Sequence, residues 1–118
     1  MNTCELKQFA ADNGWGPCSN GEPENHHILS RSLLRNNKAA TKMVEKTYSD
    51  ILMAKICANH NAGNKCADTA GARACLIQKR VDEHSDSVIR TILDDVRFTF
   101  KSHSDRAALE LDAILSRG

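Results

Sequence analysis

The 118-residue chain has few aromatic residues and no long apolar run. Aromatic residues make up 4% of the sequence, too few to supply stacking platforms for nucleic-acid bases. No stretch approaches the roughly 18 apolar residues of a membrane span. The N-terminal segment also lacks the basic start and apolar run of a secretory signal. We therefore expect a cytoplasmic protein without membrane association, folded as a single domain over residues 1–118.

A large excess of either charge is also absent, since 16 lysine and arginine residues face 15 acidic ones. The basic residues are unevenly placed, however, because seven of them and only two acidic residues lie between His26 and Lys65. On a helix starting near Ser30, five basic residues would share one arc of about 80°. They are Arg31, Arg35, Lys38, Lys42 and Lys46. This arc predicts contacts with a nucleic-acid backbone, although a solvated helix face has the same pattern.

The five cysteines do not suit a disulfide framework, because their number is odd and cytoplasmic thiols stay reduced. Metal binding is the more natural use. Residues 57–60 form a C-x-x-H turn, which can present one thiolate and one imidazole to a tetrahedral ion. Cys4, Cys18 and Cys66 are available as further ligands, whereas Cys66 and Cys75 could equally be small core residues.

Apolar periodicity and capping residues predict an α+β, mostly helical chain. An irregular segment over 12–25 contains both prolines, and a short extended piece follows at 26–29. The predicted helices are one from Ser30 that begins or breaks at Asn36-Asn37, one capped by Asp68 or Thr69 and reaching about Asp82, one over 85–100, and one from Ser104.

Two adjacent histidines, His26 and His27, begin the extended piece. Neighbouring side chains on a strand point to opposite faces, so the two imidazoles cannot perform the same task.

Taken in order, "HHI-x-x-RS", a basic helical connection and "C-x-x-H-N" resemble the HNH endonucleases. In this class of His-metal finger nucleases, a β-hairpin and a helix hold one catalytic divalent ion. The resemblance covers roughly Cys4 to Cys75, and the asparagine at the last motif position is similar to that of phage-type members. It implies a ββα-metal core over residues 1–75 and a C-terminal helical extension over 76–118.

The resemblance assigns different roles to the two histidines. It implies that His26 binds a catalytic Mg²⁺ or Mn²⁺ and that His27 is the general base that activates water. The second ligand of this ion would be Asn61, or His60 if there is no zinc knuckle. The family also orients its base with an asparagine. Asn37 is the candidate for that role, and Asn36 and Asp50 are the alternatives.

The resemblance further implies a structural Zn²⁺ bound by Cys4, Cys18, Cys57 and His60, with Cys66 as a substitute for Cys4. The upstream cysteines of the family usually form a tight pair, whereas thirteen residues separate Cys4 from Cys18 here.

The leading hypothesis is therefore a metal-dependent endonuclease that hydrolyses or nicks DNA phosphodiester bonds, in the host cytoplasm if the chain is phage-encoded. The alternative is a non-catalytic, zinc-stabilised module that binds nucleic acid or protein. A helical interaction protein is the third possibility. Monomer and homodimer both stay open, because the apolar stripes over 88–96 and 109–115 could pair within one chain or between two.

Overall fold

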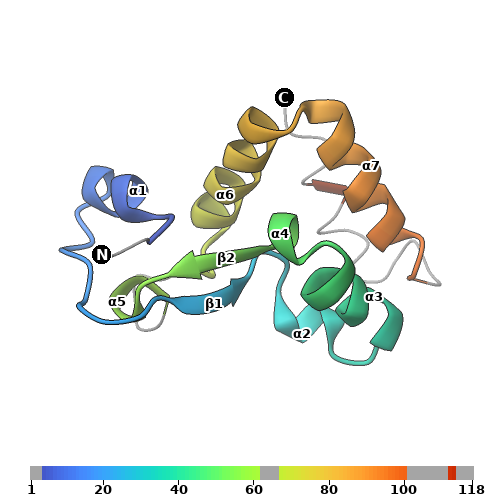
Figure 1. The fold of residues 1–118 in the computed structure, drawn as a ribbon, viewed down its shortest axis with the longest axis horizontal. Coiled ribbons are helices and arrows are strands. Elements are labelled where there is room, and N and C mark those ends of the chain that lie inside the picture. The colour runs from blue at the N-terminus through green and yellow to red at the C-terminus, as the bar shows by residue number, and fades with distance from the viewer. Residues whose placement is uncertain (1–3, 62–66, 101–111, 114–118) are drawn as a thin grey trace.

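The computed structural model describes residues 4–61, 67–100 and 112–113. These residues form a two-stranded antiparallel sheet together with several helices, which confirms the predicted α+β, mostly helical class. Figure 1 shows α6 and α7 on one side of the strands, α1 and α5 near one end of the sheet, and α2, α3 and α4 near the other.

The sheet consists of β1 (Glu24–His27) and β2 (Met53–Ile56). In its register His26 lies opposite Ala54, and both residues are buried. His27 is half-buried and belongs to the other face, because adjacent strand residues alternate. The strand geometry thus separates the two imidazoles. Sequence periodicity did not locate β2, since its four residues are too short for a clear alternation.

Short helical segments connect the two strands. They are α2 (Arg31–Leu34), α3 (Lys38–Lys42), the π-helical turn η1 (Met43–Thr47) and α4 (Ser49–Leu52). The helical run is interrupted between α2 and α3, at the Asn36-Asn37 pair where a break or start of the helix was predicted. The predicted break is confirmed, because the side chain of Asn37 accepts a hydrogen bond from the Ala40 N–H and starts a new helix, so the five predicted basic residues do not lie on one continuous helix.

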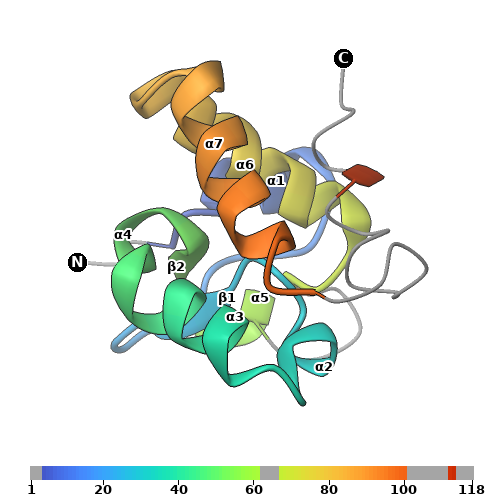
Figure 2. The ribbon, with the colours of Figure 1, turned by 90° about the vertical axis from the view of Figure 1, so that its right-hand side faces the viewer.

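The second half contains α6 (Ala70–Glu83) and α7 (Asp86–Arg97), close to the predicted boundaries. The hydroxyl groups of Thr69 and Ser85 cap them by accepting hydrogen bonds from backbone N–H groups. Figure 2 shows α7 lying alongside α6, and both helices bury apolar faces in the common core. The predicted helix from Ser104 lies outside the described residues, apart from a short helical piece at 112–113.

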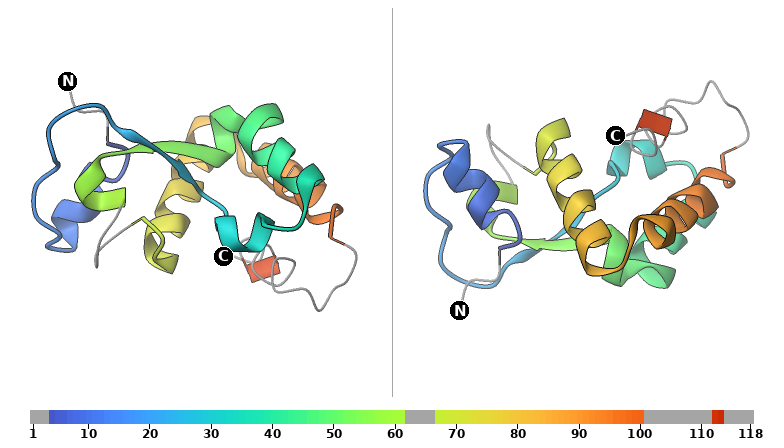
Figure 3. Two further views of the ribbon diagram at one scale, coloured as in Figure 1. Left: turned by 90° about the horizontal axis from the view of Figure 1, so that it is seen from below. Right: turned by 90° about the horizontal axis from the view of Figure 1, so that it is seen from above.

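The N-terminal segment runs along the free edge of β2 before α1 (Lys7–Asp12). The Glu5 N–H donates to the Lys55 carbonyl, and the Lys55 N–H donates to the Glu5 carboxylate, each at 2.8 Å. In both views of Figure 3, α1 lies beside α5 (Ala58–Asn61), the short helix that follows β2. This arrangement brings the first cysteine of the chain to the end of β2.

One apolar core joins the sheet to the helices. Its fully buried side chains include Leu6, Ile28, Val44, Leu52, Ile56, Leu76, Ile77, Ile89, Leu93 and Val96. Within the described ranges, no helix combines the length and apolar character that a bilayer crossing requires.

Candidate metal centre and histidine site

Three cysteines and one histidine come together where the N-terminal segment meets α5. The ligand atoms of Cys4, Cys18, Cys57 and His60 all lie within 4.8 Å of one another. We call these four residues the Cys3His cluster. From the three sulfur atoms, the distances to the His60 Nδ1 are 3.7 Å for Cys4, 3.8 Å for Cys18 and 3.2 Å for Cys57. The cluster is thus compact enough to hold one metal ion, as the sequence predicted.

Local structure explains how residues distant in sequence meet here. Cys57 directly follows β2, and its carbonyl accepts the N–H groups of His60 and Asn61, which closes the short turn of α5. That turn places the two side chains of the C-x-x-H motif side by side. Cys4 is positioned by the pairing of the N-terminal segment with β2. Cys18 comes from a loop that bends at Gly16, whose φ of +84° favours glycine.

The ring of His60 is held in one orientation. It is 1% exposed, packs against Trp15 and places its Nε2 3.1 Å from the Gly16 carbonyl. A carbonyl only accepts hydrogen bonds, so Nε2 carries the proton and the lone pair of Nδ1 faces the three sulfur atoms. His60 is therefore arranged as a ligand within the cluster.

The thiols of the cluster influence one another. Burial, followed by the neighbouring Cys57 and Cys4 side chains, raises the pKa of the Cys18 thiol to about 12. Burial also disfavours the Cys57 thiolate, but hydrogen bonds from the backbone of Ser19 and His60 outweigh it and lower the pKa of the Cys57 thiol. Cys66, the predicted substitute ligand, lies outside the described residues.

The two histidines of β1 occupy different environments. His26 is 5% exposed, and its Nε2 is buried without a hydrogen-bond partner among the described residues. Burial and the positive charge of Arg73 lower the pKa of His26 to about 4, against opposing effects of the Asp68 charge and the nearby Asn61 side chain. The ring is therefore neutral at pH 7, with Asn61 beside it.

Asn61 is fixed by β1. Its side-chain N–H donates to the Glu24 carboxylate at 2.9 Å, and Glu24 lies two residues before His26 on the same face of the strand. The structure thus brings together His26 and Asn61, the two predicted ligands of the catalytic ion.

His27 borders a surface pocket of about 480 Å³ on the opposite face of β1. The pocket is lined by His27, Arg31, Leu34, Arg35, Thr41 and Glu45. The His27 Nε2 lies 2.6 Å from the Glu45 carboxylate, which comes from η1. Two predicted DNA-binding arginines therefore share a pocket with the predicted general base.

Asn37, the predicted orienting residue, is engaged elsewhere. Its Oδ1 accepts from the Ala40 N–H at 2.9 Å, and its Nδ2 donates to the carbonyl and hydroxyl of Thr99 at 3.0 and 3.2 Å. None of these described contacts reaches His27. The prediction that Asn37 orients the base is therefore corrected. Its amide oxygen caps α3, and its amide nitrogen binds Thr99, which lies just after α7.

Replacing Asn37 by alanine should lower the free energy of unfolding by about 1–2 kcal/mol, because α3 loses its cap and Thr99 loses its partner. Asn36→Ala is the matched control. Asn36 is exposed, so its loss should stay within about 0.5 kcal/mol. Urea unfolding of both variants measures the difference. Equal stability of the two would contradict the capping role.

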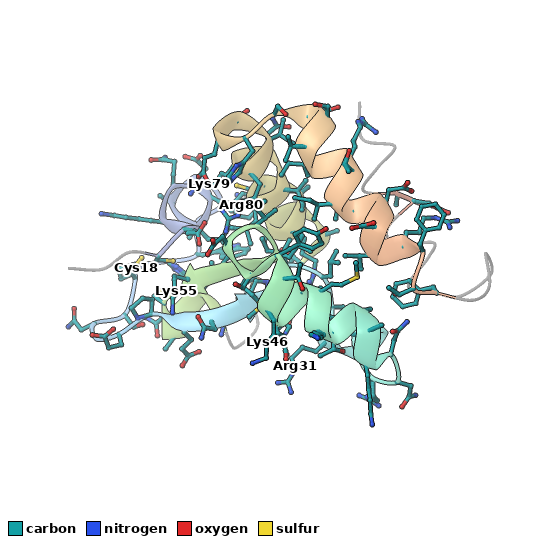
Figure 4. All side chains as sticks on the ribbon, turned by 45° about the vertical axis from the view of Figure 1, so that its right-hand side comes forward. Cys18, Arg31, Lys46, Lys55, Lys79 and Arg80 are labelled. Atoms are coloured by element: carbon teal, nitrogen blue, oxygen red, sulfur yellow. The ribbon has the colours of Figure 1, made fainter. Side chains whose placement is uncertain are left out.

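The predicted basic residues no longer share one helix. Arg31 lies on α2 and Arg35 just after it, whereas Lys38 and Lys42 lie on α3 and Lys46 on η1. All five are exposed. Figure 4 shows Arg31 and Lys46 extending from the same side of the molecule, away from α6 and α7. The positive surface is thus built from separate segments.

Sequence reasoning missed three residues that contact the histidine site. Glu45 contacts His27, and Glu24 contacts Asn61. Arg73 on α6 donates to the carbonyls of His27 and Ile28, where β1 ends. The contacting residues are 18 to 46 positions apart in the sequence, so no local pattern could predict them.

No protein-family model, curated protein or solved structure matches this chain. The function is therefore argued from the residues and their geometry.

Proposed function

We propose that the chain is a small metal-dependent nuclease that hydrolyses DNA phosphodiester bonds, with a structural zinc in the Cys3His cluster. The observation that carries the nuclease proposal is the different environment of the two adjacent histidines. One has a buried, unpartnered nitrogen beside an asparagine, and the other opens on a pocket with two arginines.

The donor set of the Cys3His cluster suits zinc. A tetrahedral zinc with ordinary Zn–S and Zn–N bonds separates a sulfur from a nitrogen ligand by about 3.6 Å. The three distances between cysteine sulfurs and the His60 Nδ1, from 3.2 to 3.8 Å, bracket that value. With four protein ligands this ion would be structural, since a catalytic zinc needs an open position. His60 would then be a zinc ligand, which leaves Asn61 for the catalytic ion.

His26 and Asn61 fit a second, hard divalent ion such as Mg²⁺ or Mn²⁺. The Asn61 amide oxygen is of the ligand type that Mg²⁺ and Mn²⁺ favour, a neutral imidazole would add a nitrogen ligand, and an ion would satisfy the orphaned Nε2 of His26. A bound ion would stabilise the negative charge that develops on the phosphate and on its leaving 3′ oxygen.

The remaining roles belong to the other face of β1. His27 would take a proton from the attacking water, since imidazole exchanges protons near neutral pH. Arg31 and Arg35, which line the pocket beside His27, would attract DNA phosphates by their positive charge. The exposed lysines of α3 and η1 would contact the DNA backbone on either side, without reading its bases.

His27→Ala should lower the rate of plasmid cleavage in Mg²⁺ or Mn²⁺ by at least about 100-fold, because it removes the base. Mn²⁺ binding, followed by calorimetry, should persist in this variant and disappear in His26→Ala. His84→Ala is the control. Because His84 is exposed at the end of α6, this variant should cut DNA at the normal rate.

A wild-type protein that cuts no DNA form, or a His27→Ala variant that cuts as well as wild type, would sink the nuclease proposal. DNA binding without cleavage, unchanged by His27→Ala, would instead support the zinc-stabilised binding module.

A further inference from the structure

The carboxylate of Glu45 is placed to control the protonation pattern of the His27 ring. Its Oε2 lies 2.6 Å from the His27 Nε2, and both residues line the pocket. The side chain of Glu45 is 42% exposed and that of His27 is 15% exposed, so the pair lies at the boundary between protein and solvent. Glu45 is also an acidic side chain among exposed basic ones, with Lys42 and Lys46 close in sequence.

The chemistry of this hydrogen bond defines the tautomer. An ionised carboxylate can only accept, so the proton of a neutral His27 ring must be on Nε2. Its lone pair is then on Nδ1, which makes no hydrogen bond to the described residues. A ring held this way by a carboxylate can take a proton from water at its other nitrogen, as in the acid–histidine pairs of hydrolases.

We propose that Glu45 is the positioning residue of the His27 base, in the role for which the sequence offered only Asn36, Asn37 and Asp50. This inference rests on the proposed nuclease function. Glu45 accepts the Nε2 proton of His27 across a 2.6 Å contact, which fixes the orientation of the ring and keeps the Nδ1 lone pair available.

The step balances without any further reagent. Nδ1 of His27 takes one proton from water, and the hydroxide oxygen forms a new bond to phosphorus. The bond between phosphorus and the 3′ oxygen breaks, and that oxygen leaves with its electron pair and is protonated by solvent. Release of the proton on Nδ1 to solvent restores the neutral ring.

Asn37 supports this arrangement indirectly, as a helix cap. The η1 turn follows α3 directly, so the cap at Asn37 fixes the start of the helical run that carries Glu45. The base and its positioning residue thus come from two segments, β1 and η1, whose side chains meet at the lining of the pocket.

Three variants of the full-length protein test this inference, with the metal content kept constant. Glu45→Ala should lower kcat for plasmid cleavage by about 100-fold with KM nearly unchanged, because only the reactivity of the base is lost. Glu45→Gln should recover part of this loss, since its amide oxygen can still accept the Nε2 proton. Glu83→Gln is the matched control and should cut normally, because Glu83 is exposed at the end of α6 and lies outside the pocket.

A second measurement separates this inference from the nuclease proposal. Long-range ¹H–¹⁵N NMR of wild type should place the proton of neutral His27 on Nε2, and Glu45→Ala should give a mixture of tautomers. A proton on Nδ1 in wild type, or an undiminished kcat in Glu45→Ala, would overturn the role of Glu45 alone. A wild type that never cuts DNA would overturn the nuclease proposal, while the tautomer would still decide whether Glu45 orients the ring.

Discussion

Removing the zinc that we propose for the Cys3His cluster should abolish the cooperative thermal transition of the purified protein. Structural zinc sites contribute about 10–16 kcal/mol of apparent binding free energy, which is as large as the whole stability of a typical domain. In this chain the ion would connect the N-terminal segment, the loop before β1 and α5, because the cluster draws ligands from all three. Elemental analysis should find one zinc per chain, and circular dichroism after chelation should show the loss of structure.

Two cysteine variants make this test specific to the cluster. Cys57→Ser should lose the zinc and unfold, because Cys57 is 2% exposed and lies 3.2 Å from the His60 Nδ1. Cys75→Ser is the control. Cys75 is half-buried on α6, outside the cluster, and burial raises the pKa of its thiol, so this variant should keep its zinc. A zinc-free wild type with an unchanged melting temperature would contradict the structural-metal proposal.

Replacing Arg80 by methionine should lower the free energy of unfolding by about 3–5 kcal/mol. Arg80 is 3% exposed, and its guanidinium bonds to the Glu5 carboxylate and to the carbonyls of Ile51 and Met53. Methionine would fill part of the volume but leave a partly buried carboxylate and two carbonyls without this partner. Figure 4 shows Lys79 and Arg80 together on α6, and Lys79 also donates to the Glu5 carbonyl.

A double-mutant cycle with Glu5→Gln measures how much of this loss belongs to the ion pair. The second substitution should recover part of the stability of Arg80→Met, because it removes the uncompensated charge. Arg90→Met is the control. The ion pair of Arg90 with Asp86 on α7 is about half exposed, so its loss should cost about 0.5 kcal/mol or less. Equal losses from the two arginine substitutions would refute the special role of Arg80.

The parts of the fold that could be predicted are those encoded by local signals. Thr69 and Ser85 cap their helices, and apolar residues at helical spacing mark the buried faces of α6 and α7. The alternation of a strand was enough to separate the environments of His26 and His27. The C-x-x-H spacing likewise predicted one pair of the Cys3His cluster, because a single turn brings these two side chains together.

The parts that could not be predicted depend on contacts between distant segments. Glu45 meets His27 only because η1 lies next to the end of β1 in the fold, and nothing near either residue in sequence signals this. Asn37 was assigned to the base because an asparagine was expected. Its position before a helical stretch is also a capping signal, and the side chain caps α3. From sequence alone, the charged Arg80 would be placed at the surface. It is buried instead, and backbone carbonyls accept its hydrogen bonds there.

The pairing of Glu5 with β2 also covers part of an open strand edge. An open strand edge offers unpaired N–H and carbonyl groups to the strands of other molecules and so promotes aggregation. Here the Lys55 N–H and carbonyl are both bound to Glu5, and the Met53 carbonyl is bound to Arg80. The backbone N–H and carboxylate of Glu5 and the guanidinium of Arg80 thus close the outer edge of β2 without a third full strand, so loss of either side chain would leave one of these edge groups open to another molecule.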